Sequence, residues 1–347
     1  PISLVIAALL WGGVGATALS IFGNTGWALV VADWFGPEVA RSWTAALTAP
    51  WVEEIFKALG IVLIYLIARR EIDDVMDGFV YGAMVGLGFT LVEDVFYFLG
   101  AFGGEVEGVL TGFYLRVIAS GFYGHVLYSA LAGMGIAYFV TRKGVVSEAR
   151  RWAVPTGLFL IAVLAHFLWN SPLLDLFPEE PWEGTDWLVI LLATAVKGLP
   201  LLVFVVLMVR LAQRREHRWL RAALETEVGR PGLTREELEA LDHPVDRRRA
   251  RREAAARGGP RAAKAMKKLQ REQVNLAMVA TRTHDPDHPD VLRQHVYCAE
   301  LRAWVRRLMA SSEGEGARPS GGPPPGEAPP PPPPGATPPG SPPPPST

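Results

Sequence analysis

The chain has 347 residues, of which 50% are hydrophobic and 20% are charged, and its formal net charge is −1. This average conceals three zones: residues 1–212 carry 11 Lys and Arg against 18 Asp and Glu, residues 213–311 carry 22 against 14, and residues 312–347 carry 1 against 3. The near-neutral total says nothing about partners, because the zones differ in sign. The single cysteine, Cys298, excludes an intrachain disulfide framework, a cysteine zinc cluster and a Cys-ligated iron–sulfur centre.

Apolar segments fill residues 1–212, which we predict to be a transmembrane domain. A spanning helix needs about 20 mostly apolar residues, and the segments that approach this length are residues 2–22, 27–49, 51–69, 77–100, 109–141, 152–171 and 186–212. The first lacks a basic leader and a clear cleavage site, so we interpret it as a transmembrane segment. The fifth is interrupted by Gly121 and Gly124, which suggests a short helix followed by a spanning one. We predict an all-α polytopic membrane bundle of about seven transmembrane helices.

The charges between these segments predict their orientation. Basic residues follow the third, fifth and seventh segments: Arg69, Arg70, Arg142, Lys143, Arg150, Arg151, Arg210, Arg214 and Arg215. The positive-inside rule places these residues on the cytoplasmic side. The acidic loops around residues 105–107 and 175–186 fall on the other side. Counting back through three crossings places Pro1 outside, and the chain after residue 212 is expected in the cytoplasm.

Two further regions follow the membrane domain. Residues 213–310 are polar, Arg-rich and helical in their periodicity, and Thr234 with an acid three positions later is typical of a helix start. The basic stretch 247–257 would suit anionic lipid or nucleic acid. We favour a solvated helix held near the inner leaflet by its charge, and we expect no nucleic-acid partner. Residues 311–347 contain 16 of the 29 prolines and are predicted to be disordered.

Ionisable and polar side chains occur inside the predicted spans, where an isolated charge is costly and indicates a functional site. They are Glu53, Glu54 and Lys57 in the third segment, Glu93 and Asp94 in the fourth, His125 in the fifth, His166 and Asn170 in the sixth, and Lys197 in the seventh. The orientation places the glutamates, the histidines and Asn170 at a similar depth in the outer half of the bilayer. Scattered structural charges have no reason to converge on one layer, so we predict that these residues surround one cavity.

Each of these residues also has a structural explanation. Glu53 and Lys57 are four residues apart and could form a local ion pair. Glu93 and Asp94 could mark a helix end, and His125 could be a hydrogen-bonded core residue. Lys197 could only balance the acids. However, two adjacent acids with one lysine leave one acid over, and the histidine and the asparagine of the sixth segment share a helix face.

The chemistry that this set supports is hydrolysis by an activated water. A carboxylate accepts a proton from water, a histidine donates or orients, and an amide or a histidine stabilises an oxyanion. The sequence has no Gly-x-Ser-x-Gly elbow, no cysteine in the membrane domain and no His-Glu-x-x-His helix. Serine, cysteine and zincin-type mechanisms are therefore disfavoured. Glutamate and two histidines could instead hold a zinc ion, as in catalytic sites with three N or O ligands.

Four motifs in order resemble the PrsW family of intramembrane proteases, which is related to the CAAX prenyl endopeptidases. The motifs are Glu53-Glu54-Ile55-Phe56-Lys57 after Pro50, the run from Asp77 to Glu93, Gly124-His125, and His166-Phe167-Leu168-Trp169-Asn170. The resemblance covers about residues 1–212. Asp94 departs from the pattern, because Asn commonly follows the second-motif glutamate, and it adds a negative charge that favours a cation.

This resemblance implies a multi-spanning peptidase in a bacterial cell membrane, in contact with membrane lipid. The excess of Arg over Lys, 28 to 6, also suggests a GC-rich bacterial genome. The implied substrate is a single-pass membrane protein, such as an anti-sigma factor that is cut on its extracytoplasmic side. The residues carried over by motif as catalytic are Glu53, Glu54, Glu93, His125, His166 and Asn170.

Two mechanisms and two other functions stay open from the sequence. Without a metal, Glu53 or Glu54 activates the water with His125, and His166 and Asn170 stabilise the oxyanion. With a metal, the available ligands are Glu53, Glu54, Glu93, His125 and His166. Lys57 already supplies a positive charge, so we favour the metal-free glutamate mechanism and expect either no cofactor or zinc. A transporter or proton relay is disfavoured because no inverted repeat is obvious, and a non-catalytic scaffold is the remaining alternative. The sequence does not indicate the oligomeric state.

Overall fold

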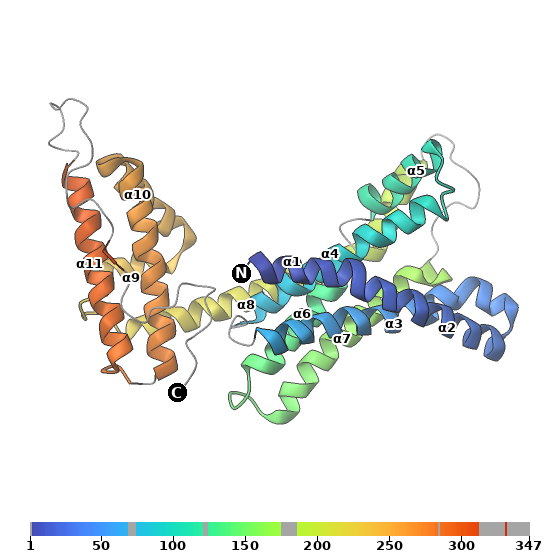
Figure 1. Ribbon diagram of the computed structural model, residues 1–347, viewed down its shortest axis with the longest axis horizontal. Helices are drawn as coiled ribbons and strands as arrows, with labels where there is room; N and C mark the ends of the chain where they lie inside the picture. Colours follow the sequence, from blue (N-terminus) through green and yellow to red (C-terminus); the bar gives the residue numbers. More distant parts are fainter. Residues whose placement is uncertain are drawn as a thin grey trace. The chain divides into compact units, whose positions relative to one another are not determined.

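The computed structural model describes residues 2–68, 74–120, 124–174, 186–283, 285–311 and 330–331. Every regular element in this part of the chain is helical (Figure 1), which confirms the predicted all-α class. The chain divides into two compact units, Pro1–Gln213 and Arg214–Thr347. The predicted disorder of residues 311–347 falls almost wholly on residues outside the described part.

The first unit begins with two long helices that are joined at Gly36. The first run, Ile2–Phe35, consists of α1 (Ile2–Leu10), the π-helical turn η1 (Trp11–Ala16) and α2 (Thr17–Phe35), and the second is α3 (Pro37–Ile67). Their 34 and 31 residues correspond to about 51 and 46 Å at 1.5 Å per residue. Gly36 has a φ of 83°, a left-handed value that favours glycine, and Pro37 occupies the first turn of α3.

This hairpin corrects the predicted boundaries, because three expected segments form only two helices. The turn expected between residues 22 and 27 is helical. Gly23 lies there because α2 approaches α3 closely: a Cβ at this position would lie 2.5 Å from Val52 Cγ1. Pro50 lies inside α3, although it removes the hydrogen bond to the carbonyl of Ala46. A chain that stays helical keeps its other backbone groups paired, which a bilayer demands.

The number of helices in the hairpin also sets the side on which its first residues lie. Ala8 packs in one buried cluster with Ile61 and Ile64, so the start of the first run lies beside the end of α3 (Figure 1). With two helices instead of three, the end near Ile2 falls on the same side as the end of α3. The three helices on which the expected side of Pro1 rested are thus corrected to two, and Pro1 itself is not among the described residues.

The remaining helices of the first unit follow the predicted segments more closely. They are α4 (Val75–Leu99), α5 (Val106–Phe113), the π-helical η2 (Tyr114–Ala119), α6 (His125–Thr141), α7 (Glu148–Asn170), the short 3-10 helix η3 (Pro172–Leu174) and α8 (Asp186–Glu225). The expected division of segment 109–141 into a short and a longer helix is confirmed. Gly121, the basic pair Arg69 and Arg70, and most of the acidic loop 175–186 lie outside the described residues.

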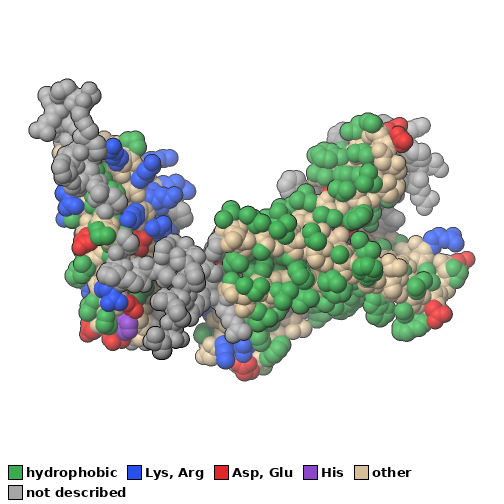
Figure 2. Space-filling model, viewed as in Figure 1, with side chains coloured by type: hydrophobic (Ala, Val, Ile, Leu, Met, Phe, Trp, Pro, Cys, Tyr) green, Lys and Arg blue, Asp and Glu red, His purple; other side chains and the backbone are tan. Residues whose placement is uncertain are grey.

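Among the described residues, four helices are long and apolar enough to cross a membrane: Ile2–Phe35, Val75–Leu99, Glu148–Asn170 and Leu188–Glu225. Helix α6 is apolar but shorter, with 17 residues, and α3 has the length but contains Glu53, Glu54 and Lys57. Figure 2 shows apolar side chains over the outer surface of this unit, as expected for contact with lipid tails. The chain is therefore a polytopic membrane protein, and the count of seven spans stays a prediction.

Helix α6 lies at the centre of the first unit, because nearly all of its side chains from His125 to Tyr138 are buried. Glycines bring α4 very close to it. A Cβ at Gly78, Gly82 or Gly86 would lie 2.2, 2.2 or 2.3 Å from the carbonyl oxygen of Gly133, Ser129 or His125, respectively. Small residues at this spacing allow helix backbones to approach in lipid. The last of these contacts fixes the start of α6, where His125 lies.

The second unit is a helical bundle with a core of its own. It contains the end of α8, α9 (Arg235–Asp242), α10 (Pro244–Thr283), which is kinked at Gly258 and Gly259, and α11 (Pro289–Ser311). One buried cluster joins α8, α9 and α10, and a second joins α10 and α11 around Cys298. The predicted helix start is confirmed by a capping box between Thr234 and Glu237. The sequence predicted helices here but not a packed core.

Candidate active site

Glu53, Glu54 and Lys57 lie together in the middle of α3 and are all buried; Glu54 and Lys57 have 0% exposure. Lys57 Nζ donates a hydrogen bond to Glu54 Oε1 at 2.7 Å and lies 3.7 Å from Glu53 Oε2. Successive residues of a helix point about 100° apart, so the two acids face different neighbours. Glu54 faces Lys57 and α7, whereas Glu53 lines a cavity.

His125 connects α3 with α4. Its Nε2 lies 2.9 Å from Glu93 Oε2, and its Nδ1 lies 2.8 Å from Lys57 Nζ. A charged lysine can only donate, so Nδ1 accepts from Lys57 while Nε2–H donates to Glu93. Glu93 therefore fixes both the tautomer and the orientation of the ring.

His166 reaches the acids from α7. Its Nδ1 lies 3.0 Å from Glu54 Oε1, and its ring stacks on Tyr128 with 4.9 Å between centroids and 14° between planes. An ionised carboxylate can only accept, so Nδ1–H donates to Glu54 and Nε2 presents its lone pair. That nitrogen lies 3.9 Å from Glu53 Oε2.

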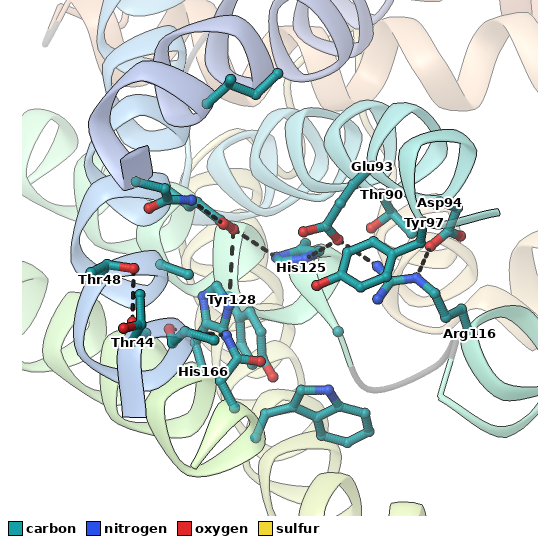
Figure 3. A pocket seen from close by; sticks show the side chains of 18 of the residues that line it. Thr44, Thr48, Thr90, Glu93, Asp94, Tyr97, Arg116, His125, Tyr128 and His166 are labelled. Carbon is teal, nitrogen blue, oxygen red and sulfur yellow. Dashed lines mark hydrogen bonds and ion pairs between the residues drawn. The ribbon is translucent and has the colours of Figure 1, made fainter. Parts of the chain in front are cut away.

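The two carboxylate oxygens of Glu53 have different surroundings. Oε1 accepts a hydrogen bond from Asn24 Nδ2 at 3.0 Å. Oε2 is buried, has no hydrogen-bond partner among the described residues, and lies between His125 Nδ1 at 3.8 Å and His166 Nε2 at 3.9 Å. Figure 3 shows both histidines at this level of the cavity. A buried carboxylate oxygen without a partner is costly. Glu54 Oε2 also has no partner among the described residues, but Glu54 does not line the cavity, so Glu53 Oε2 is the atom of the cluster best suited to receive a proton or a cation.

Arg116, from η2, closes the opposite side of the cluster. Its Nη2 lies 2.5 Å from Glu93 Oε2, its Nε lies 2.5 Å from Asp94 Oδ1, and its guanidinium covers the ring of Tyr97 (Figure 3). The cation that the additional charge of Asp94 favours is thus present in the chain itself. Arg116 pairs with both carboxylates, offsets one of their two negative charges and holds η2 against α4.

A cavity of about 630 Å³ opens over this cluster. Its lining includes five of the six predicted site residues, namely Glu53, Glu93, His125, His166 and Asn170. Neither Glu54 nor Lys57 lines the cavity; Glu54 is connected to it through His166, which does. Asn170 lines the cavity, but its amide donates to the Ala45 carbonyl at 3.5 Å and contacts neither glutamate of α3. Lys197 donates to the Trp169 carbonyl at 3.4 Å and does not line the cavity.

Two residues of this site, Asn24 and Arg116, were not among the predicted ones. Both lie inside segments that are otherwise apolar, and a polar or charged residue in such a segment is a signal that the sequence contains. Asn24 falls at the supposed end of the first segment, where a polar residue is expected in a turn. Arg116 falls in segment 109–141, before the interruption at Gly121. Neither belongs to the motifs that carried the resemblance.

The donor set also fits a metal ion. One atom each from Glu53, His125 and His166 lie within 4.8 Å of one another. Two of these atoms, Glu53 Oε2 and His166 Nε2, present lone pairs without a hydrogen-bond donor between them. A carboxylate and two imidazoles are ligands that catalytic zinc accepts, with a further position open. Lys57 Nζ, at 2.8 Å from His125 Nδ1, is the group that would have to give up this contact.

Comparison with known proteins identifies the family of this chain. A family model described as "PrsW family intramembrane metalloprotease" matches residues 1–212. The "Protease PrsW" of Geobacillus kaustophilus (strain HTA426) is 30% identical over 146 residues, which cover 42% of this chain and 52% of that relative. The chain thus matches about half the length of that relative, and no solved structure matches it. The family match covers the whole cavity described above, and the chain belongs to the PrsW family of intramembrane proteases.

Proposed function

We propose that this chain is an intramembrane endopeptidase that hydrolyses a peptide bond of a membrane-associated protein. The observation that carries the proposal is Glu53 Oε2, a buried oxygen without a hydrogen-bond partner between two histidines in a cavity. Such a carboxylate can accept a proton from a water as the water oxygen bonds to the substrate carbonyl carbon. The proton then passes to the leaving amine as the C–N bond breaks.

The neighbouring residues prepare Glu53 for this role. Glu54 orients His166, and Glu93 orients His125, through the contacts at 3.0 and 2.9 Å. The positive charge of Lys57 lies 2.8 Å from His125 Nδ1 and 3.7 Å from Glu53 Oε2, and it offsets negative charge that develops on the substrate oxygen. Asn170 lines the same cavity and supplies an amide donor for that oxygen.

A divalent ion such as zinc would be held by Glu53, His125 and His166. When bound, such an ion acidifies a water and polarises a carbonyl. Glu53 is then a ligand rather than the proton acceptor, so the same geometry gives this residue two alternative roles. Metal content and chelation distinguish them: an active protein without stoichiometric metal assigns Glu53 as the base, whereas activity lost on chelation and restored by zinc assigns it as a ligand.

A proton relay is the less favoured function. In the described part of the first unit, the buried acidic, basic and histidine side chains all belong to this one network: Glu53, Glu54, Lys57, Asp94, His125 and His166. A relay across a membrane needs such groups at successive depths.

The proposed setting is a bacterial cell membrane with the cavity on the extracytoplasmic side. Arg142 and Lys143 follow α6, whose 17 residues separate them from His125 by about 25 Å. Basic residues favour the cytoplasmic side, so the site lies toward the other surface and Arg214–Thr347 lies in the cytoplasm. The proposed substrate is a single-pass membrane protein, for example an anti-sigma factor.

The experiment is cleavage of co-expressed single-pass membrane proteins by the wild type and by Glu53→Gln. The matched control is Glu148→Gln, because Glu148 is exposed and pairs only with Arg151. We expect cleavage by the wild type and by Glu148→Gln, and none by Glu53→Gln. Equal cleavage by Glu53→Gln would refute the proposal and favour a non-catalytic scaffold.

A further inference from the structure

We propose that Asn24 is a positioning residue that aims Glu53 at the reacting atoms, an inference that rests on the proposed function. Asn24 lies on α2, 29 positions before Glu53, and its Nδ2 donates to Glu53 Oε1 at 3.0 Å. The other oxygen, Oε2, is left buried between His125 and His166. The amide thus decides which oxygen faces the two histidines.

The need for such a residue follows from the freedom of a glutamate side chain. Its terminal torsion is broad, so a carboxylate with no fixed hydrogen bond exchanges and tilts its two oxygens. Lys57 does not prevent this, because its 2.7 Å bond goes to Glu54 and it is 3.7 Å from Glu53. Asn24 therefore makes the one side-chain hydrogen bond to Glu53 among the described residues.

The packing of the hairpin delivers Asn24 to this position. The neighbouring Gly23 allows α2 to approach Val52 so closely that a Cβ would lie 2.5 Å from its side chain. The face of α2 toward the cavity is formed by Ile21, Asn24, Thr25 and Ala28, at helical spacing. The close approach thus occurs beside Glu53, where a short amide can reach the carboxylate.

Only the donor end of the amide can serve this purpose. An ionised carboxylate repels the amide oxygen and accepts from its nitrogen. Asn24 Oδ1 is itself buried without a hydrogen-bond partner among the described residues. A polar residue kept merely to join helices would be expected to use both ends of its amide, whereas here only the contact with Glu53 is made.

The alternative is that Asn24 only strengthens helix packing, as polar residues do in membranes. The two roles differ in what they change. A positioning residue alters turnover with little effect on substrate affinity, and its effect depends on Glu53. A packing residue alters thermal stability and leaves turnover intact.

The test compares Asn24→Leu, Asn24→Ala and Asn24→Gln in the full-length protein in detergent, with a cleaved single-pass protein as substrate. Thr17→Val is the control: Thr17 is buried on the same helix, bonds only the Gly12 carbonyl and lies outside the cavity. We expect kcat to fall about 10- to 100-fold in the Leu and Ala variants, as for other residues that orient a catalytic group. KM should change less than about twofold, Thr17→Val should keep its kcat, and Gln, which retains the amide, should restore part of the loss.

A double-mutant cycle with Glu53→Asp completes the test, because the shorter acid cannot keep the same bond to Asn24. If Asn24 acts through Glu53, adding Asn24→Leu to Glu53→Asp should cost much less than it costs in the wild type. Fully multiplicative losses would overturn the inference, as would an Asn24→Leu or Asn24→Ala protein with a lower Tm but wild-type kcat. If the Leu variant does not fold, the Ala variant decides. A wild type that cleaves nothing would overturn the proposed function. An active wild type with either of the results above would overturn only the inference about Asn24, so the two failures are distinguishable.

Discussion

Gly86 offers a test of how helix packing controls the site. An alanine Cβ at this position would lie 2.3 Å from the His125 carbonyl oxygen, whereas real contacts are essentially never shorter than 3.0 Å. The two helices must therefore separate locally by at least the difference, about 0.7 Å. No side-chain rotation relieves the clash, because the neighbour is backbone.

This displacement acts directly on the contacts of the proposed active site. Glu93 follows Gly86 by two helical turns on α4, so a shift of α4 also moves Glu93. If the full shift adds to the 2.9 Å contact between His125 Nε2 and Glu93 Oε2, the distance becomes about 3.6 Å, too long for a hydrogen bond. A misplacement of about 1 Å can cost about 100-fold in rate, and overpacking typically costs about 1–3 kcal/mol of stability. We expect Gly86→Ala to lower kcat about 10- to 100-fold and to lower the Tm.

The assay is turnover of a single-pass substrate at saturation, with thermal unfolding in the same detergent. Gly157→Ala is the matched control, because a Cβ on that residue of α7 meets nothing within 4 Å; it should keep kcat and gain up to about 1 kcal/mol of stability. Gly82→Ala clashes equally, at 2.2 Å from the Ser129 carbonyl, but one turn from His125. It should lose stability like Gly86→Ala and keep more turnover. Wild-type kcat and Tm in Gly86→Ala would refute the reasoning.

Three further predictions concern other parts of the chain. Arg116→Gln leaves Glu93 and Asp94 as adjacent carboxylates without their shared cation, so kcat should fall. Adding Asp94→Asn to Arg116→Gln should restore part of the lost kcat. A double variant no better than Arg116→Gln would contradict the charge argument. Burial raises the pKa of the Cys298 thiol, so thiolate stays scarce and a maleimide should not label the native protein at about pH 7 or 9, but only after unfolding; rapid native labelling would contradict the packed core of α10 and α11. Truncation after residue 215 removes no residue that lines the cavity, so the protein should still cleave its substrate, and a folded but inactive product would argue against a dispensable second unit.

Some residues of the site could be recognised from their own sequence surroundings alone. Glu53, Glu93, His125 and His166 were found because an ionisable group in an apolar segment is costly wherever it lies. Their convergence was predicted from depth alone, since antiparallel helices bring equal depths together. The sequence could not distinguish Glu53 from Glu54, because the distinction depends on how α3 is rotated about its own axis relative to α7. The structure separates them: one acid lines the cavity and the other holds Lys57 and His166.

The errors have equally definite causes. Gly23 and Asn24 look like a turn, yet their actual roles are close helix contact and a hydrogen bond to a residue 29 positions away. Pro50 looks like a helix start, but the helix tolerates it in its interior. In each case a tertiary contact overrides a local preference, and no single-sequence pattern reports such a contact. The core of the second unit was missed because its buried positions are divided among four helices, of which α9 is short and α10 is kinked, with many arginines between them.

The pairing of Lys57 with Glu54 has a consequence for how the protein is made. The partners lie three residues apart on one helix, whereas His125 and His166 are synthesised 68 and 109 residues after Lys57. When α3 leaves the ribosome and meets the lipid, no histidine of the site exists yet. A bare acid and a bare base would each oppose insertion, but a bonded pair enters as a nearly neutral unit. Helix α3 therefore brings its own counter-ion into the bilayer, and the preceding helix has already supplied Asn24. Half of the site is therefore in place before His166 has been translated.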